Sequence, residues 1–212
     1  MKLKTELYQT QLARWPKTGR HILAQFDEES IVVYQAYTPS IAEYALSHQR
    51  FGGPFSYERM SWIKPNFLWM MFRCGWASKF NQESVLAVRL RRAGFEAILR
   101  EAVHSSFVRA IYETEEKWGT ALDRSDVRMQ WDPDHHPSGA KVERRAIQLG
   151  LKGETLRRYG TEWIVSIEDI TQFCRQQHEH VAAKRLDLLV TPKDVYALKD
   201  SSLRNRITEC TG

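Results

Sequence analysis

The most constraining feature of the chain is a run of β-branched and aromatic residues, Ile31 to Tyr34, that lies shortly before a proline, Pro39. Such side chains favour β-structure, and an uninterrupted apolar run favours a buried strand. Proline suits the first position of a helix because its missing N–H has no helical partner there. We therefore predict a buried strand over 31–34 and a helix from about Pro39 to Gln49.

Further strands are predicted from alternation and β-propensity. Residues 85–90 are apolar except for Arg89, residues 127–131 alternate apolar and polar side chains, and residues 163–167 form another β-rich run, so each segment is expected to be a strand. The segment 132–139 is dense in Asp, Pro, His and Gly, so it is expected to be an exposed loop.

Two further helices are expected. One runs over about 94–118, because its apolar side chains recur at helical spacing: Phe95, Ile98, Leu99, Ala102 and Val103. The other covers about 171–189. Together these elements predict an α+β fold, with a mixed or antiparallel sheet as its core and flanking helices.

The chain has 212 residues, 42% of them hydrophobic and 27% charged, which is typical of a globular protein. This length predicts one domain over 1–200 and a polar, frayed C-terminal tail over 201–212. No apolar stretch approaches the roughly 20 residues that cross a bilayer, and the N-terminus lacks the apolar centre of a secretory signal. We expect no membrane partner and a cytoplasmic location.

Residues with metal-binding or redox chemistry are few. Cys74, Cys174 and Cys210 are widely spaced, so neither a disulfide framework nor a CxxC metal site is expected. The adjacent pair at 135–136 and the pair at 178 and 180 are expected to be solvated histidines, and no metal site is predicted. Dinucleotide-binding, phosphate-loop, zinc-protease and nucleophile-elbow motifs do not occur in the sequence.

The segment 55–73 interleaves Arg59, Lys64 and Arg73 with six aromatic residues. This mixture suits the stacking of a planar ring and the binding of phosphates. Core packing is the preferred interpretation for its most apolar residues, which are Phe67, Leu68, Met70, Met71 and Phe72. For the other residues, two interpretations are equally favoured: the side chains pack in the core, or they bind an anion. These residues are Arg59, Ser61, Trp62 and Lys64.

The chain resembles an uncharacterised family, domain of unknown function 4291. The resemblance covers most of the chain and rests on Ile31-Val-Val-Tyr-Gln-Ala-Tyr37, Arg59-Met-Ser-Trp-Ile-Lys-Pro65, Phe67-Leu-Trp-Met-Met71, Gln130-Trp-Asp-Pro133 and Ile147-Gln-Leu-Gly150. It implies no activity.

A more distant resemblance is to the ADP-ribosyltransferases. Val33-Tyr-Gln-Ala-Tyr-Thr-Pro39, the helix after it and Gly52-Gly53 are similar to the first strand, helix and Gly-rich turn of that superfamily. Thr161-Glu-Trp-Ile-Val165 is similar to a strand that carries the catalytic glutamate of poly-ADP-ribose polymerases. The resemblance implies an ADP-ribosyltransferase-like fold and NAD as substrate.

This resemblance also implies roles for single residues. Glu162 would be the catalytic carboxylate, which stabilises the oxocarbenium-like sugar as the bond to nicotinamide breaks. Gln35 stands where His or Arg is usual and would bind ribose or the carboxamide. The cofactor-binding group would be Arg20, Tyr37, Arg59, Ser61, Trp62 and Lys64, with Tyr37 or Trp62 stacked on nicotinamide, Ser61 in the middle motif, and Arg20 or Lys64 on the pyrophosphate.

Three functions stay open at this stage. An NAD-dependent transferase would pass ADP-ribose to an unknown acceptor, with a nucleic acid among the candidates, or would cleave NAD. The alternative is a non-catalytic nucleic-acid-binding module. The formal charge of +5 and the basic, aromatic segment favour this alternative. A catalytically inactive relative that senses NAD or another nucleotide is the third.

Overall fold

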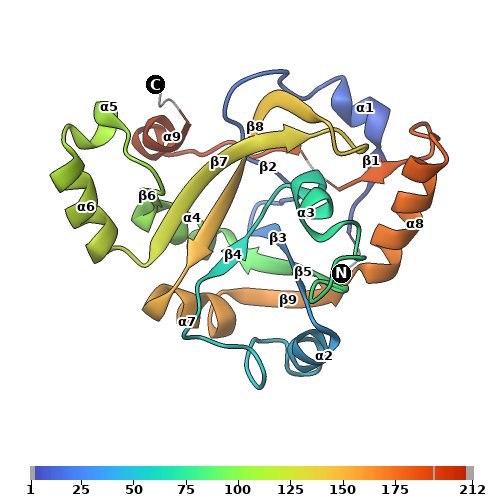
Figure 1. Ribbon diagram of the computed structural model, residues 1–212, viewed down its shortest axis with the longest axis horizontal. Coiled ribbons are helices and arrows are strands. Elements are labelled where there is room, and N and C mark those ends of the chain that lie inside the picture. The colour runs from blue at the N-terminus through green and yellow to red at the C-terminus, as the bar shows by residue number, and fades with distance from the viewer. Residues whose placement is uncertain (1–2, 193, 209–212) are drawn as a thin grey trace.

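The computed structural model describes residues 3–192 and 194–208. They form a mixed α/β structure of small sheets and surrounding helices (Figure 1). In chain order the elements are β1 (Glu6–Leu7), α1 (Tyr8–Leu12), β2 (Leu23–Ala24), β3 (Ser30–Tyr37), α2 (Pro39–His48), β4 (Ser61–Ile63), α3 (Phe67–Cys74), β5 (Ser84–Arg91), α4 (Arg92–Glu101), β6 (Val103–His104), α5 (Arg109–Tyr112), α6 (Glu115–Arg124), β7 (Val127–His135), β8 (Lys141–Leu151), α7 (Gly153–Thr161), β9 (Ile164–Asp169), α8 (Thr171–Ala182), β10 (Val190–Thr191), β11 (Asp194–Val195) and α9 (Ser201–Thr208).

The first main sheet has the order β3-β5-β9 and is antiparallel throughout. Its centre is buried on both faces. Ile31 and Val33 pack into one hydrophobic cluster, and Val32 and Tyr34 pack into the other, so neighbouring residues of β3 face opposite cores. This explains why the sequence shows an unbroken apolar run here instead of an alternating pattern. The predicted strand over 31–34 is confirmed.

The second main sheet has the order β4-β8-β7-β6, with β6 parallel to β7 and the other pairs antiparallel. In Figure 1 the long strands β7 and β8 run diagonally across the view, whereas β5 and β9 run horizontally. An isolated bridge between Tyr34 and Lys64 connects the two sheets. The N–H of Tyr34 donates to the carbonyl of Lys64 over 2.7 Å, and the N–H of Lys64 donates to the carbonyl of Tyr34 over 3.3 Å.

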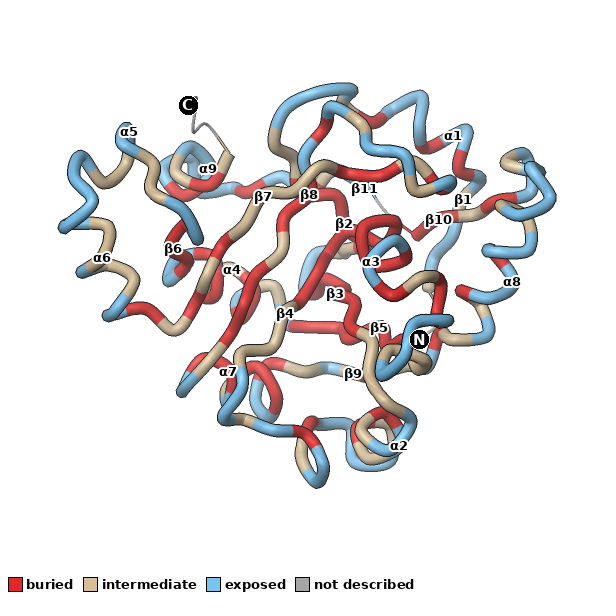
Figure 2. The backbone as a smooth tube through the Cα atoms, viewed as in Figure 1, coloured by how far each residue is buried: buried red, intermediate tan, exposed pale blue. Residues whose placement is uncertain are grey.

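Helices cover the faces of both sheets. Apolar residues of α4, α7 and α9 belong to the cluster that lies under Ile31 and Val33. Helix α3 and Cys174 of α8 belong to the cluster on the other face. Figure 2 shows β3 and β5 largely buried, and α5 and α6 exposed or half-buried at the periphery. The expected combination of mixed and antiparallel sheets with flanking helices is therefore confirmed.

The helix expected over 94–118 is wrong beyond its first turns. Helix α4 ends at Glu101, Val103 and His104 pair in parallel with β7, and α5 and α6 follow as separate helices. Ala102 and Val103 are buried as the helical spacing required, yet they are buried in an extended segment. The apolar pattern thus predicted the burial of these residues correctly, but the pairing with β7 determined their extended backbone conformation.

The exposed loop expected over 132–139 is also wrong in its first half. Strand β7 continues to His135, and Asp134 is fully buried because Arg144 of β8 forms an ion pair of 2.7 Å with it. His135 is 3% exposed and stacks against both Phe72 and Trp69, so it is not the solvated histidine that we expected. Of the residues assigned to the core, only Phe72 is exposed.

The C-terminal segment is ordered where a frayed tail was expected. Residues 201–208 form α9, whose Leu203 and Ile207 are buried in the core, and Arg206 donates hydrogen bonds to three carbonyls at the end of α4. Residues 209–212, including Cys210, lie outside the described residues. Helix α8 ends at Ala182, short of the expected 189, where Lys184 adopts a positive φ of 59°.

The other predicted elements are confirmed, namely the helix at 39–49 and the strands at 85–90, 127–131 and 163–167. Cys74 and Cys174 are buried free thiols. Within 3–192 and 194–208, the helices are too short or too polar to cross a membrane. In the same ranges, His, Cys, Asp and Glu side chains form no group of three that could hold a metal ion.

Candidate functional site

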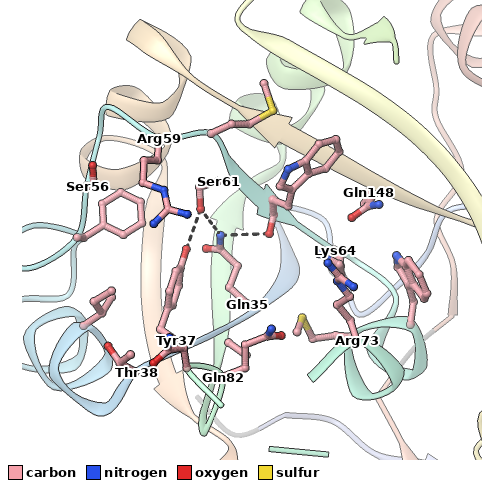
Figure 3. Close-up of a pocket in the computed structure, with 18 of the residues that line it drawn as sticks. Gln35, Tyr37, Thr38, Ser56, Arg59, Ser61, Lys64, Arg73, Gln82 and Gln148 are labelled. Carbon is pink, nitrogen blue, oxygen red and sulfur yellow. Dashed lines mark hydrogen bonds between the residues drawn. The ribbon is translucent and has the colours of Figure 1, made fainter. Parts of the chain in front are cut away.

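A cavity of about 860 Å³ opens where the two main sheets meet (Figure 3). Strand β3 contributes Gln35 and Tyr37, and β4 contributes Ser61 and Trp62. The other walls come from the loop after α2, from α3, from the loop before β5, and from β7 and β8. Its polar side chains are Gln35, Tyr37, Thr38, Ser56, Arg59, Ser61, Lys64, Arg73, Asn81, Gln82, Gln130, Asp132 and Gln148.

The cavity brings together most of the residues that sequence reasoning singled out. Six of them line it, from the two segments 35–37 and 59–64: Gln35, Tyr37, Arg59, Ser61, Trp62 and Lys64. Two others lie elsewhere. Arg20 forms an isolated parallel bridge with Arg145 of β8 and is absent from the lining.

Glu162 also lies outside the lining of this cavity. It follows the last residue of α7, it is exposed, and its carboxylate accepts a hydrogen bond of 3.3 Å from Arg158 one helical turn earlier. Strand β9 begins two residues later and pairs with β5, so Glu162 precedes the strand, although the resemblance implied a strand that carries this glutamate.

Gln35 is held on both sides of its side-chain amide. Its Nε2 donates to Ser61 Oγ over 2.9 Å and to the carbonyl of Trp62 over 3.3 Å, and its Oε1 accepts from the hydroxyl of Tyr159. The side chain is 2% exposed. Gln35 therefore ties β3 to β4 and fixes the position of Ser61.

Tyr37 completes this network, because its hydroxyl lies 2.8 Å from Ser61 Oγ. The ring also makes edge contacts with Phe51 and Phe55. Burial raises the pKa of the Tyr37 phenol well above its ordinary value, although the hydrogen bond with Ser61 partly opposes this. The phenol is thus neutral at physiological pH and offers the cavity an apolar ring with a fixed hydroxyl.

Lys64 is the most unusual residue of the cavity. It is 4% exposed, and within the described part of the chain its ammonium group has no hydrogen-bond or ion-pair partner. Burial, followed by repulsion from Arg73, lowers the pKa of Lys64 to about 8, and Asp132 opposes the shift. A buried charge without a partner destabilises a folded protein, and an anion in the cavity would remove much of that penalty.

Two arginines add to the positive charge. Arg59 and Arg73 line the cavity, and both are exposed. Neither forms an ion pair with another described residue. Figure 3 draws Arg73 beside Lys64, and Arg59 on the other side, beyond Ser61. Three cations thus converge on the cavity from different segments.

Asp132 of β7 is the carboxylate of the cavity, and the described lining contains no other acidic side chain. The side-chain amide of Gln130 donates to its Oδ1 over 3.0 Å, and that of Gln148 donates to its Oδ2 over 2.8 Å. Two amides from neighbouring strands therefore fix the orientation of this carboxylate.

Sequence reasoning missed Asp132, Arg73, Gln82, Gln130 and Gln148 as site residues. A signal was present for most of them. Arg73 ends the basic and aromatic segment. Gln130 and Asp132 belong to the short motif at 130–133, and Gln148 belongs to the one at 147–150. Their convergence depends on the pairing of β7 with β8, which the sequence patterns did not reveal.

The fold and the cavity define a class of mixed α/β protein with a basic, aromatic, ligand-sized site at the junction of two sheets. The chain belongs to a family described as Domain of unknown function (DUF4291), whose model matches residues 21–196. The match includes every residue of the cavity lining. The search of the curated proteins found no match to the chain.

Proposed function

We propose that the cavity binds a nucleotide through its phosphates, that NAD is this nucleotide, and that the protein transfers ADP-ribose from NAD to an acceptor or to water. The observation that carries the proposal is the buried side chain of Lys64, whose ammonium group lacks a partner within the described residues and which lines the cavity together with two arginines that form no ion pair. Phosphate oxygens are the ligands that such a cluster of cations favours.

The other features of the cavity suit the remaining parts of a dinucleotide. The indole of Trp62 and the ring of Tyr37 are planar surfaces for a base or for nicotinamide. Ser61 has a hydroxyl whose position is fixed by Gln35 and Tyr37. In this proposal Gln35 acts by positioning Ser61, since both ends of its amide already have partners. A volume of about 860 Å³ accommodates a ligand of this size.

The order of elements agrees with the proposed ADP-ribosyltransferase-like fold. Strand β3 leads into α2, and a turn with Gly52 and Gly53 follows, as in the first motif of that superfamily. The reaction requires a carboxylate beside the sugar. Glu162, the candidate from the sequence, lies outside the cavity lining, whereas Asp132 lies within it. The exposed guanidinium groups of Arg59 and Arg73 would suit a nucleic acid as the acceptor.

Thermal stabilisation by NAD tests the binding step. A ligand at 100 times its Kd stabilises the native state by about 2.7 kcal/mol, which is readily measured. NAD should stabilise the wild type and should stabilise Lys64→Met far less. Lys79→Met is the matched control, because Lys79 is exposed and lies outside the cavity. No stabilisation of the wild type at millimolar NAD would contradict the proposal.

Release of nicotinamide tests the reaction. Wild-type protein should release nicotinamide from NAD, and Glu162→Ala decides whether the exposed glutamate takes part. If binding is strong but no nicotinamide is released with water or a nucleic acid as acceptor, the protein is a nucleotide sensor. If nucleic acid binds with strong salt dependence while NAD does not bind, the non-catalytic nucleic-acid-binding module is the correct function.

A further inference from the structure

One side of the cavity carries both signs of charge. Lys64 and Arg73 supply positive charge, and Asp132 supplies a carboxylate that interacts with Lys64 through their charges. Figure 3 draws Gln148, one of the two amide donors to Asp132, on the same side of the cavity as Lys64 and Arg73. A ligand that binds a phosphate on the cations therefore places its neighbouring atoms against Asp132.

Asp132 can accept further hydrogen bonds. Each carboxylate oxygen has two acceptor positions, and the amides of Gln130 and Gln148 use one on each oxygen. Both amides donate, so their own carbonyl oxygens also remain as acceptors. The surroundings of Asp132 thus offer several acceptors and require donors from the ligand. A second phosphate would be repelled there, whereas a pair of hydroxyl groups would be bound.

We propose that Asp132 binds the hydroxyl groups of a ribose whose phosphate is held by Lys64, so that the site selects ribonucleotides over their 2′-deoxy counterparts. This inference rests on the proposed function, because it assigns the sugar of the nucleotide to a place in the same cavity. A 2′-deoxyribose presents one donor where ribose presents two, and the charged acceptor then loses a hydrogen bond.

The test compares the Kd values of NAD and of its two monodeoxy forms, with 2′-deoxyribose in the nicotinamide half or in the adenosine half. The wild type should bind one of these deoxy forms roughly 10- to 100-fold more weakly than NAD, as expected for a lost hydrogen bond to a charged group. In Asp132→Asn this ratio should fall to about 3-fold or less. Inorganic pyrophosphate should bind the variant at least as well as it binds the wild type, since a negative charge near the phosphate has been removed.

Asp123→Asn is the matched control, because Asp123 is an exposed aspartate on α6 outside the cavity, and it should keep the wild-type ratio. Asp132→Ala serves as a second variant if the asparagine variant is poorly folded, and the comparison of ligands on wild-type protein needs no variant. The inference is overturned if wild-type protein binds all three forms equally, or if the ratio persists in both Asp132 variants. If wild-type protein binds none of the three, the proposed nucleotide function itself fails, and the inference fails with it.

Discussion

Replacing Lys64 with methionine should stabilise the ligand-free protein at neutral pH. Burial lowers the pKa of Lys64 from its ordinary value of 10.5 to about 8, and each pKa unit corresponds to about 1.4 kcal/mol. The buried charge therefore costs the folded state about 3 kcal/mol at pH 7. Methionine has a similar shape and no charge, so the variant is free of this penalty.

The pH dependence of this difference has a definite sign. Below pH 8 the lysine is protonated in the folded and unfolded states, and the full penalty is present. Between about pH 8 and pH 10.5 the folded state loses the proton first, so the unfolded state binds more protons and the wild type gains stability as pH rises. The advantage of Lys64→Met should shrink through this window.

Urea denaturation of the two proteins between about pH 7 and pH 10 measures the effect as a difference in the free energy of unfolding. Taking the difference at each pH cancels the titration of the buried tyrosines, which both proteins share. The exposed control Lys79→Met should stay within about 0.5 kcal/mol of the wild type. Equal stabilities of Lys64→Met and wild type at pH 7, or a difference that does not change with pH, would refute a charged, unpaired lysine in the cavity.

Three other substitutions test the packing around the site and the core. Tyr159→Phe removes the donor to Gln35 Oε1 and should lower the free energy of unfolding by about 1–3 kcal/mol in urea denaturation, and an unchanged value would show that the buried amide finds another partner. Ile207→Ala should lower it by about 2–5 kcal/mol because the side chain is fully buried, whereas a frayed segment would give almost no change. In Gly94→Ala the new Cβ would lie 2.5 Å from Cγ of Trp163, so calorimetry should show a lower Tm although alanine favours helices, and a higher Tm would contradict this.

The sequence predicted the central strands well because their burial leaves a direct trace in composition. The apolar runs at 31–34 and 85–90 identify β3 and β5, and Pro39 marks the start of α2. The failures occurred where a partner distant in the chain determines local structure. Val103 is extended because β7 pairs with it, although its spacing from Ile98 and Leu99 also fits a helix.

Polar residues were misjudged for the same reason. Asp134 suggested a solvated loop, but Arg144 lies opposite it on β8 and allows its burial. The candidate site was predicted best where its residues are close in sequence, as with Ser61, Trp62 and Lys64. Asp132 joins them only through the pairing of β7 with β8 and of β8 with β4, and no local pattern carries that information.

The bridge between Tyr34 and Lys64 links the wall of the cavity to the backbone hydrogen bonds that join the two main sheets. Each backbone amide of this pair donates across the seam between the two sheets, and the side chain of Lys64 faces the proposed ligand. Lys64 thus takes part both in the proposed ligand binding, through its side chain, and in the pairing of the two sheets, through its backbone. The exchange of these two amide hydrogens with deuterium should slow when an anion fills the cavity, so native-state hydrogen exchange would report binding without a label and before any substrate is identified.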